Sequence, residues 1–279
     1  MTGAVNFFSH PEISSSRLLV TWADDFADLG ERVAVALLDR LGGQEYAALA
    51  PVGYFPLAGV SIDADLVRFP QTVLWYLPSA GLVLLRSDMP LYNWHRFVST
   101  LLDIAQENCH VTELYSLGGI PSFFAHTGSR EIIAVSGSPE ERDLLAGDGV
   151  NRDMDFETVP GQKPSINSFV LWSARRRGLT AYNLWLPSPF YLRRAGDPAA
   201  VRKAVDFLRR RLGVDIDLGP LDGEVAAQHK ALARLRLEKP EVDKAIGVLE
   251  TSLSLDEVEA EQLAGEVDSL FAGMAGGAS

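Results

Sequence analysis

The sequence predicts an α/β fold in which a mostly parallel central sheet carries helices on both faces, followed by a helical appendage. Two observations predict the sheet: short apolar runs alternate with amphipathic helical patterns, and most of the connections between them are short. A third observation predicts the appendage, because after Gly219 aromatic residues become rare and strong helix formers dominate. We therefore expect an α/β core domain over residues 1–218 and a C-terminal helical appendage over residues 219–279.

The first half of the core domain alternates predicted strands with helices. Leu18–Trp22 is an apolar run typical of a buried strand, and Leu29–Leu41 repeats an apolar residue at every fourth position until Gly42 ends the helix. The continuous apolar run Leu82–Leu85 indicates a strand covered on both faces. Asp88 is expected to cap the helix that follows. Further strands are predicted over residues 46–49, 66–69 and 73–77.

The second half of the core continues the alternation. Ser165 is expected to cap a helix that ends at Gly178, and Asp197 a helix that ends at Gly213. Strands are predicted over residues 111–117, 131–135 and 180–186. The loops over residues 55–65 and 146–164 are longer than usual, and long loops in compact domains are more often functional or mobile than neutral.

The appendage is predicted to contain three helices. The first spans Leu221–Leu237, and Pro240 begins the second. Ser254–Glu257 has the pattern of a capping box for the third helix, with Leu253 and Val258 as its hydrophobic staple.

The third helix of the appendage is amphipathic. Acids fill one face, and the other carries an apolar stripe formed by Ala260, Leu263, Ala264, Val267, Leu270 and Phe271. Burial of such side chains contributes more than exposed ion pairs do, so the stripe is expected to hold the helix in place. The basic helix ends at Arg177 and Arg211 are the expected complements of the acidic face.

Composition limits the classes of function. The formal charge of −12 argues against a nucleic-acid partner, and seven of the acids lie without a Lys or Arg among them in residues 245–279. The most apolar stretch, Thr72–Leu85, is broken at Pro78 and is shorter than the roughly 20 residues that span a bilayer, so no membrane association is expected. A single cysteine, Cys109, and an N-terminus without a signal-like pattern favour a cytoplasmic location.

No catalytic motif that we recognise is present. The sequence has no P-loop, no glycine-rich dinucleotide fingerprint, no nucleophile elbow and no zinc motif. Cys109 and His110 are neighbours at a helix end, where their side chains would not face each other as a nucleophile and its base must. We therefore assign no catalytic residue, no metal and no cofactor.

The most informative arrangement of polar residues is topological. In open parallel sheets, ligands bind beyond the carboxyl ends of the strands. Four predicted strands are followed by unusual residues, and if those strands are parallel, the residues share one edge and line a cleft. The candidate ligand-binding residues there are Asp24, Asp25, Asp88, Gly118, Gly119, His126 and Thr127.

Each of these candidates also has a structural interpretation. The three aspartates are residues that commonly cap helices, Gly118 and Gly119 permit a tight turn, and a loop histidine such as His126 is often simply hydrogen-bonded. His126 is not expected to be an essential catalytic base, because the sequence offers no dedicated partner for it.

Three segments of the chain occur in a characteristic order. They are Leu82–Leu85 with Asp88–Phe97, then Leu117–Pro121 with His126-Thr127, and finally Gly178–Tyr191. In this order, and with the acidic helical tail, the chain resembles the proteasome assembly chaperone 2 family, also labelled carboxylate-amine-ligase-like. The family usually continues His-Thr with Arg-Pro, whereas Gly128 follows Thr127 here.

The resemblance implies a phosphorylase/nucleosidase-like three-layer sandwich. It also implies a non-catalytic oligomeric protein that binds other proteins, with proteasome subunits as the suggested partners and a homo-oligomer, a trimer rather than a dimer, as the suggested assembly. The alternative is an enzyme or small-ligand-binding protein that uses the strand-exit cleft for a nucleoside- or carboxylate-like molecule.

Overall fold

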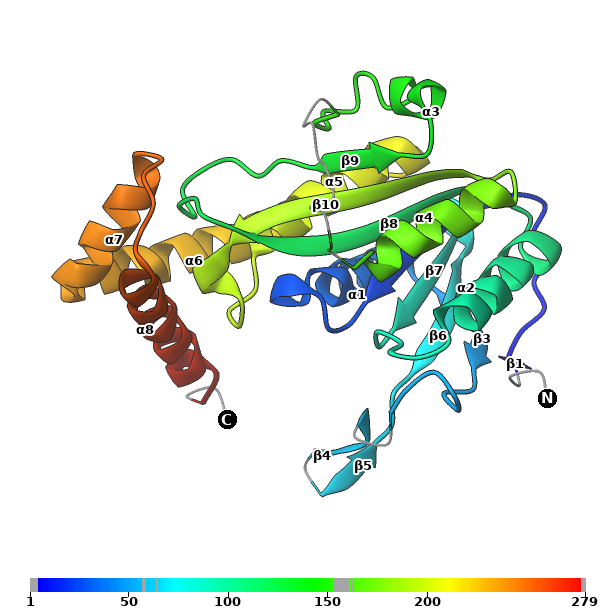
Figure 1. Cartoon of the computed structure of the whole chain (residues 1–279), viewed down its shortest axis with the longest axis horizontal. Coiled ribbons are helices and arrows are strands. Elements are labelled where there is room, and N and C mark those ends of the chain that lie inside the picture. Colours follow the sequence, from blue (N-terminus) through cyan, green and yellow to red (C-terminus); the bar gives the residue numbers. More distant parts are fainter. Residues whose placement is uncertain (1–4, 57–58, 64, 153–160, 162, 277–279) are drawn as a thin grey trace.

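The computed structural model describes residues 5–56, 59–63, 65–152, 161 and 163–276. Among these residues the central sheet has eight strands in the order β1-β3-β6-β7-β2-β8-β10-β9 (Figure 1). The strands are β1 (Val5–Phe7), β2 (Ser16–Trp22), β3 (Gln44–Leu49), β6 (Thr72–Leu77), β7 (Leu82–Ser87), β8 (Val111–Ser122), β9 (Ile133–Ser136) and β10 (Thr180–Pro189).

The four central strands are parallel and the flanking strands are antiparallel. β7, β2, β8 and β10 run in one direction, whereas β6 pairs antiparallel with β7 and β9 pairs antiparallel with β10. The α/β class is confirmed, but the expected mostly parallel sheet is mixed. The reason is local: only Pro78–Gly81 joins β6 to β7, and a parallel pair needs a crossover of about a dozen residues or more.

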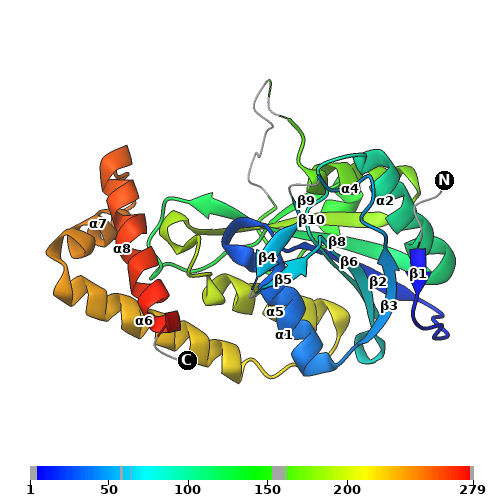
Figure 2. The same ribbon diagram turned by 90° about the horizontal axis from the view of Figure 1, so that it is seen from below.

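Helices cover both faces of the sheet (Figures 1 and 2). On one face lie α2 (Trp94–Asp103), which continues as a π-helical turn over Ile104–Asn108, and α4 (Ile166–Arg176). On the other face lie α1 (Leu29–Leu41) and α5 (Pro198–Leu212). Strand β2 contributes to both cores, with Leu18 and Val20 in one and Leu19 in the other, which is why it reads as a continuous apolar run.

Several predicted boundaries are confirmed and others are wrong. α1 spans the predicted residues, and the side chains of Ser165 and Asp197 cap α4 and α5. Asp88 caps no helix, because α2 begins only after Asn93, which adopts a left-handed conformation (φ 53°). The strand predicted at residues 66–69 is β5 (Leu66–Arg68), which lies outside the main sheet and pairs with β4 (Ser61–Asp63).

The appendage consists of α6 (Gly219–Glu238), α7 (Pro240–Glu250) and α8 (Glu257–Gly276), at the end of the molecule remote from β1 (Figure 1). Its apolar residues form a separate core with the short helix Phe190–Leu192 and Ala125. Leu263 and Val267 of α8 are buried there. The division into two domains at residue 218 stays a prediction.

Two details of the predicted appendage are wrong. The capping box lies two residues later, because Asp256 accepts the Glu259 amide at 2.8 Å and Glu259 reaches back to the Asp256 amide, and Leu253 and Val258 are both 62% exposed instead of forming a staple. Arg177 and Arg211 are not the complements of the acidic face, since both pair with acids of the core. The cations that pair with acids of α8 are Arg194, Lys239 and Lys244.

Candidate functional site

The carboxyl ends of the four parallel strands meet at one edge of the sheet, as the strand-exit hypothesis requires. β2 ends at Trp22, β7 at Ser87, β8 at Ser122 and β10 at Pro189. The seven candidate residues nevertheless separate into two groups. One group lies along this edge, and the other, His126 and Thr127, contacts the appendage.

Asp25 links the turn after β2 to two neighbouring elements. Its carboxylate accepts the Gly30 amide at 3.0 Å and the Gly119 amide at 2.9 Å, so it joins α1 to β8. Burial raises the pKa of Asp25 to about 7, although these backbone N–H groups favour the charged form. The turn that it stabilises contains Ala27 and Asp28, both with positive φ (62° and 53°). Residues other than glycine rarely adopt this backbone conformation.

Asp24 and Asp88 lie close enough to affect each other's charge. Burial and then the Asp88 carboxylate raise the pKa of Asp24, and the Met89 amide, which donates to it, opposes this shift. Asp88 exchanges two hydrogen bonds with Gln71, one from its own amide at 3.0 Å and one to its carboxylate at 2.6 Å. Asp88 therefore anchors the chain segment that precedes β6.

Gly118 and Gly119 serve close packing, and the interpretation that they permit a tight turn is wrong. Both lie inside β8, which continues to Ser122. A Cβ on Gly118 would stand 2.5 Å from the ring of Trp185, and one on Gly119 would overlap the carbonyl oxygen of Phe26. The two glycines let β10 and the turn after β2 approach the strand more closely than any side chain would allow.

His126 is buried and joins the core to the appendage. Its Nδ1 lies 2.9 Å from the hydroxyl of Tyr191, and its amide donates to the same oxygen at 2.6 Å. Its ring is 5.3 Å from that of His229 on α6. Burial, followed by the charges of His229 and Arg130, lowers the pKa of His126 to about 4, so the ring is neutral at pH 7. Thr127 donates to Glu250 of α7 at 3.1 Å.

Sequence reasoning missed two features of this region. Arg130 and Asp197 form a salt bridge at 2.6 Å whose side chains are 3% and 0% exposed, and Arg130 also donates to the carbonyl oxygen of Gly128. The Asp197-Pro198 pattern predicted that Asp197 caps a helix. It did not predict that Asp197 pairs with Arg130, which lies 67 residues earlier in the chain. The second missed feature is Arg193 and Arg194, which directly follow the short helix at the exit of β10. Two consecutive arginines in the sequence were the signal that could have identified them.

These arginines complete an open depression of about 760 Å³ beyond the strand ends. Three aspartates and the two arginines line it, so its lining carries both signs of charge. Its lining residues are Asp24, Asp25, Phe26, Ala27, Asp28, Pro121, Phe190, Arg193 and Arg194. Over the described residues, no group of three or more His, Cys, Asp or Glu side chains is placed to hold a metal ion.

Comparison with known proteins identifies the family. A model of the PAC2 family matches residues 20–236, more than half of the chain. The chain belongs to the PAC2 family. The match ends within α6, so α7 and α8 lie beyond the matched residues.

Several solved structures are similar in fold over most of the chain. A protein of unknown function from Mycobacterium tuberculosis has a TM-score of 0.75 at 19% identity and covers 97% of this chain and 93% of its own. A proteasome-assembly chaperone homologue from the same organism has a TM-score of 0.68 at 15% identity, with 83% and 99% covered. An archaeal proteasome activator from Pyrococcus furiosus has a TM-score of 0.67 at 19% identity, with 85% and 100% covered. Among curated proteins none matches the sequence.

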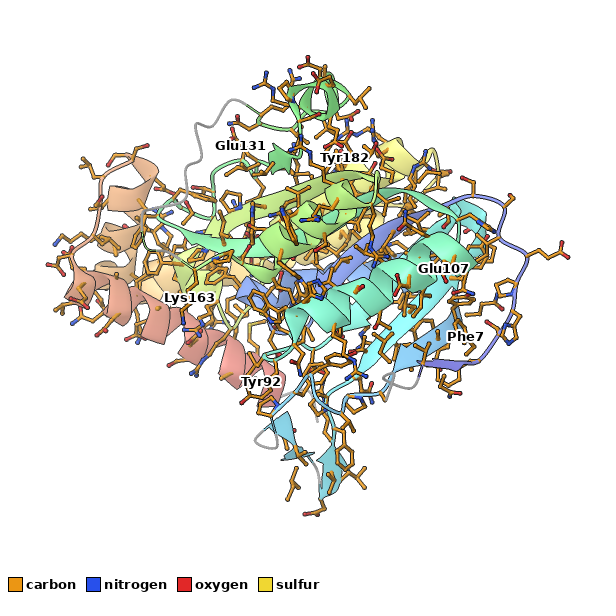
Figure 3. The ribbon with its side chains drawn as sticks, turned by 45° about the vertical axis from the view of Figure 1, so that its right-hand side comes forward. Phe7, Tyr92, Glu107, Glu131, Lys163 and Tyr182 are labelled. Atoms are coloured by element: carbon orange, nitrogen blue, oxygen red, sulfur yellow. The ribbon has the colours of Figure 1, made fainter. Side chains whose placement is uncertain are left out.

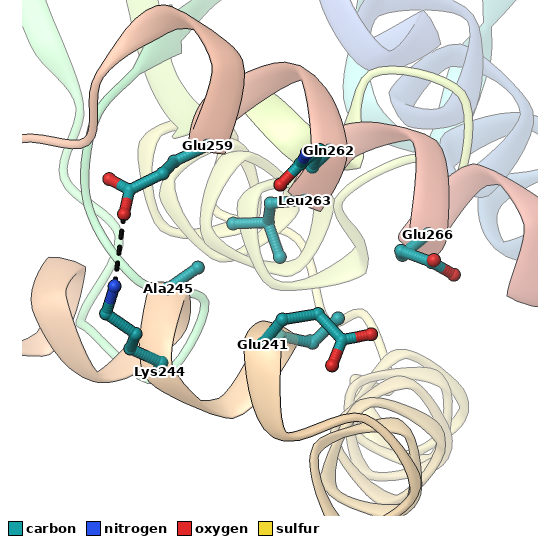
Figure 4. A pocket seen from close by; sticks show the side chains of 8 residues that line it. Glu241, Lys244, Ala245, Glu259, Gln262, Leu263 and Glu266 are labelled. Atoms are coloured by element: carbon teal, nitrogen blue, oxygen red, sulfur yellow. Dashed lines mark hydrogen bonds and ion pairs between the residues drawn. The ribbon is translucent and has the colours of Figure 1, made fainter.

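The appendage of this PAC2-family chain has a hollow of its own, about 390 Å³ between α7 and α8 (Figure 4). Glu241, Glu259 and Glu266 line it, and Lys244 bridges it by pairing with Glu259 at 3.3 Å. Glu266 is paired in turn with Lys239. The hollow therefore lies between two helices, and ion pairs join side chains across its edge. In the described part of the chain, no helix is long and apolar enough to cross a membrane.

Proposed function

We propose that this chain is a non-catalytic, homo-oligomeric PAC2-family protein that binds other proteins and acts as a chaperone for proteasome subunits in the cytoplasm. Family membership over residues 20–236 is the observation that carries the proposal. Two proteins of similar fold are described as a proteasome-assembly chaperone homologue and a proteasome activator, which suggests the class of partner.

The internal bonding of the candidate residues supports a binding role over a catalytic one. Asp25 uses its carboxylate on the amides of Gly30 and Gly119, and His126 uses Nδ1 on Tyr191. A general base needs a free acceptor within reach of its substrate, and these groups are already engaged in holding the fold together. A substitution at His126 is therefore expected to act through stability and not through turnover.

Binding to proteasome subunits is tested with the purified full-length chain. We would mix it with proteasome α subunits of its own organism and follow the mixture by size-exclusion chromatography with light scattering. A complex of defined stoichiometry is expected, together with faster assembly of the subunits into rings. If the subunits elute unchanged and assemble at the same rate, the chaperone proposal is wrong.

The same instrument tests the homo-oligomer, for which a trimer is the preferred assembly. The mass of one chain is 30.4 kDa, so a trimer would weigh three times that value. A 30.4 kDa species at micromolar concentration would contradict the oligomer.

The second candidate function is binding of a small ligand in the strand-exit depression. The observation that favours it is the presence of Arg193 and Arg194 in the lining of a hollow of about 760 Å³, because guanidinium groups recognise carboxylates. A thermal-shift panel of nucleosides and small carboxylates tests it, since a ligand that binds the folded state raises Tm. The control is the double variant Arg193→Ala/Arg194→Ala, in which a genuine shift should disappear.

A further inference from the structure

The two-stranded sheet formed by β4 and β5 projects from the body of the molecule (Figures 1 and 3). Its strands pair antiparallel, with Ile62 opposite Val67 and Ser61 opposite Arg68. The two segments also lie close together at the base of the ribbon, because a Cβ on Gly59 would lie 3.1 Å from the Pro70 ring. We call residues 59–70, where described, the arm.

The arm is amphipathic. Side chains of a strand alternate between its two faces, so Ile62 and Val67, which pair with each other, share one face. The same alternation, carried one pair further toward the base, assigns Val60 and Phe69 to this face. The opposite face carries Ser61, Leu66 and Arg68. On the apolar face all four side chains are exposed, at 39% for Val60, 76% for Ile62, 54% for Val67 and 57% for Phe69.

A second group of exposed apolar residues lies beside the base of the arm. Leu91 and Tyr92 donate their amides to the carbonyl oxygen of Tyr54, which follows Val52 by two residues. We call Leu91, Tyr92 and Val52 the loop cluster; they are 60%, 53% and 84% exposed, respectively. Asp88, three residues before Leu91, is bonded to Gln71 at the end of the arm, and Figure 3 shows Tyr92 near the base of the projecting strands.

The arm and the loop cluster together expose enough apolar surface for a stable interface. At about 150 Å² for each large side chain, their exposed fractions correspond to on the order of 600 Å². Two such contributions reach about 1,200 Å², the lower end of the range for specific protein interfaces. An isolated two-stranded ribbon is also only marginally stable in water, so the arm gains from being covered.

We propose that a second copy of this chain covers the arm and the loop cluster. The inference rests on the proposed homo-oligomer and identifies its contact surface. No charged residue belongs to the four-residue apolar face, and interfaces between permanently associated copies are more apolar than transient ones. Each chain brings both an arm and a loop cluster, so copies can cover one another without leaving either surface exposed.

The test compares two faces of the same arm by sedimentation velocity over a range of concentrations. Ile62→Ser/Val67→Ser changes the apolar face, and Leu66→Ser changes the opposite face at a residue that is 72% exposed. The first variant is expected to weaken self-association by at least about 100-fold, because two buried aliphatic side chains are lost from the contact. Leu66→Ser and Leu237→Ser, the latter at an 88% exposed leucine of α6, should associate as the unmodified chain does.

The outcomes separate this inference from the chaperone proposal. The inference is overturned if Ile62→Ser/Val67→Ser associates normally, if Leu66→Ser dissociates to the same extent, or if the unmodified chain is a monomer at micromolar concentration. Binding of proteasome α subunits is then measured on the same samples. A dissociated variant that still binds them leaves both proposals standing, whereas a wild-type oligomer that binds none contradicts the chaperone role alone.

Discussion

The appendage and the arm are both amphipathic additions to the α/β sandwich, but only the appendage is covered by its own chain. In α8, Leu263 and Val267 are 2% and 0% exposed because they pack against the helix Phe190–Leu192 and against α7. In the arm, Ile62 is 76% exposed although it belongs to an equally apolar face. An amphipathic pattern thus predicts that a face will be buried, but it does not say which molecule buries it.

The cause of the difference lies in what each region can reach. The appendage packs against the loop at residues 125–127 and the short helix after β10. These two core segments, which we call the socket, offer it both apolar contacts and hydrogen bonds. The arm leaves the body between Tyr54 and Gln71, and over the described residues its hydrogen bonds to the core lie at its base, where Gln71 pairs with Asp88. Four experiments test this contrast between the two regions.

The largest effect is expected from the ion pair behind the socket of the appendage. Arg130→Met leaves Asp197 buried without a countercharge and removes the bonds that fix the loop carrying His126. Loss of one partner of a buried pair costs about 3–5 kcal/mol in the free energy of unfolding. Urea denaturation of both proteins measures the change.

The matched control for this experiment is Arg142→Met. Arg142 pairs with Asp143 at 4.0 Å on the surface, with side chains 48% and 72% exposed, and such pairs contribute about 0–1 kcal/mol. Equal losses in the two variants would mean that the buried pair does not support the socket.

The next largest effect concerns the apolar stripe of α8. Val267→Ala/Phe271→Ala removes methyl groups and a ring from the core of the appendage and should cost about 2–5 kcal/mol in the free energy of unfolding. Glu259→Gln/Glu261→Gln should cost about 0–1 kcal/mol, because the Glu259 pair with Lys244 is solvent-exposed. The stripe variant should therefore be cut faster after Lys244 in limited proteolysis and should have the lower Tm. Greater protease sensitivity of the glutamine variant would show that charge holds the appendage in place.

Much of the fold was predictable because local signals determined it. The helical period and Gly42 defined α1, and the run Leu82–Leu85 defined a strand buried on both faces. The direction of the flanking strands was also encoded, since four residues between β6 and β7 allow only a hairpin, but the alternation of strands with helices elsewhere suggested parallel pairs. The exclusion of β5 from the main sheet depends on tertiary packing, which a strand pattern does not contain.

The candidate site was predictable in its place but not in its grouping. The strand-exit rule brought Asp24, Asp25 and Asp88 to one edge of the sheet. It also assigned His126 to that edge. β8 ends at Ser122, however, and the residues that follow carry the chain away from the edge, so that His126 lies at the appendage and contacts Tyr191. Partners far apart in sequence, such as Arg130 and Asp197, leave no local signal that would link them.

A smaller effect is expected from the pH dependence of the junction between core and appendage. The pKa of His126 is lowered to about 4 in the folded state, from about 6.5 in an unfolded chain. The unfolded state therefore binds more protons between these values, so this histidine's contribution to stability is complete above pH 6.5 and falls as pH drops toward 4. Between pH 7 and pH 4.5 the unfolding free energy should lose about 2–3 kcal/mol relative to a His126→Gln variant.

The comparison with the variant is necessary because Asp25 acts in the opposite direction. Burial raises its pKa to about 7, so its contribution falls as pH rises from about 4 to 7 and partly hides that of His126. His95→Gln, at an exposed position on α2, is the matched control and is measured in parallel. If His126→Gln behaves as His95→Gln does, the junction is not sensitive to the protonation of His126.

The smallest effect is expected in the arm. Ile62→Ser removes a side chain that its own chain leaves 76% exposed, so the stability of a single chain should change by less than about 0.5 kcal/mol. Val267→Ser, the corresponding change in the appendage, should cost several times as much because Val267 is fully buried. Denaturation at several protein concentrations separates the two contributions, since association stabilises the folded state in proportion to the logarithm of concentration. If Ile62→Ser destabilises the chain as much at the lowest concentration as at the highest, its own chain covers the arm, and the contrast between the two regions fails.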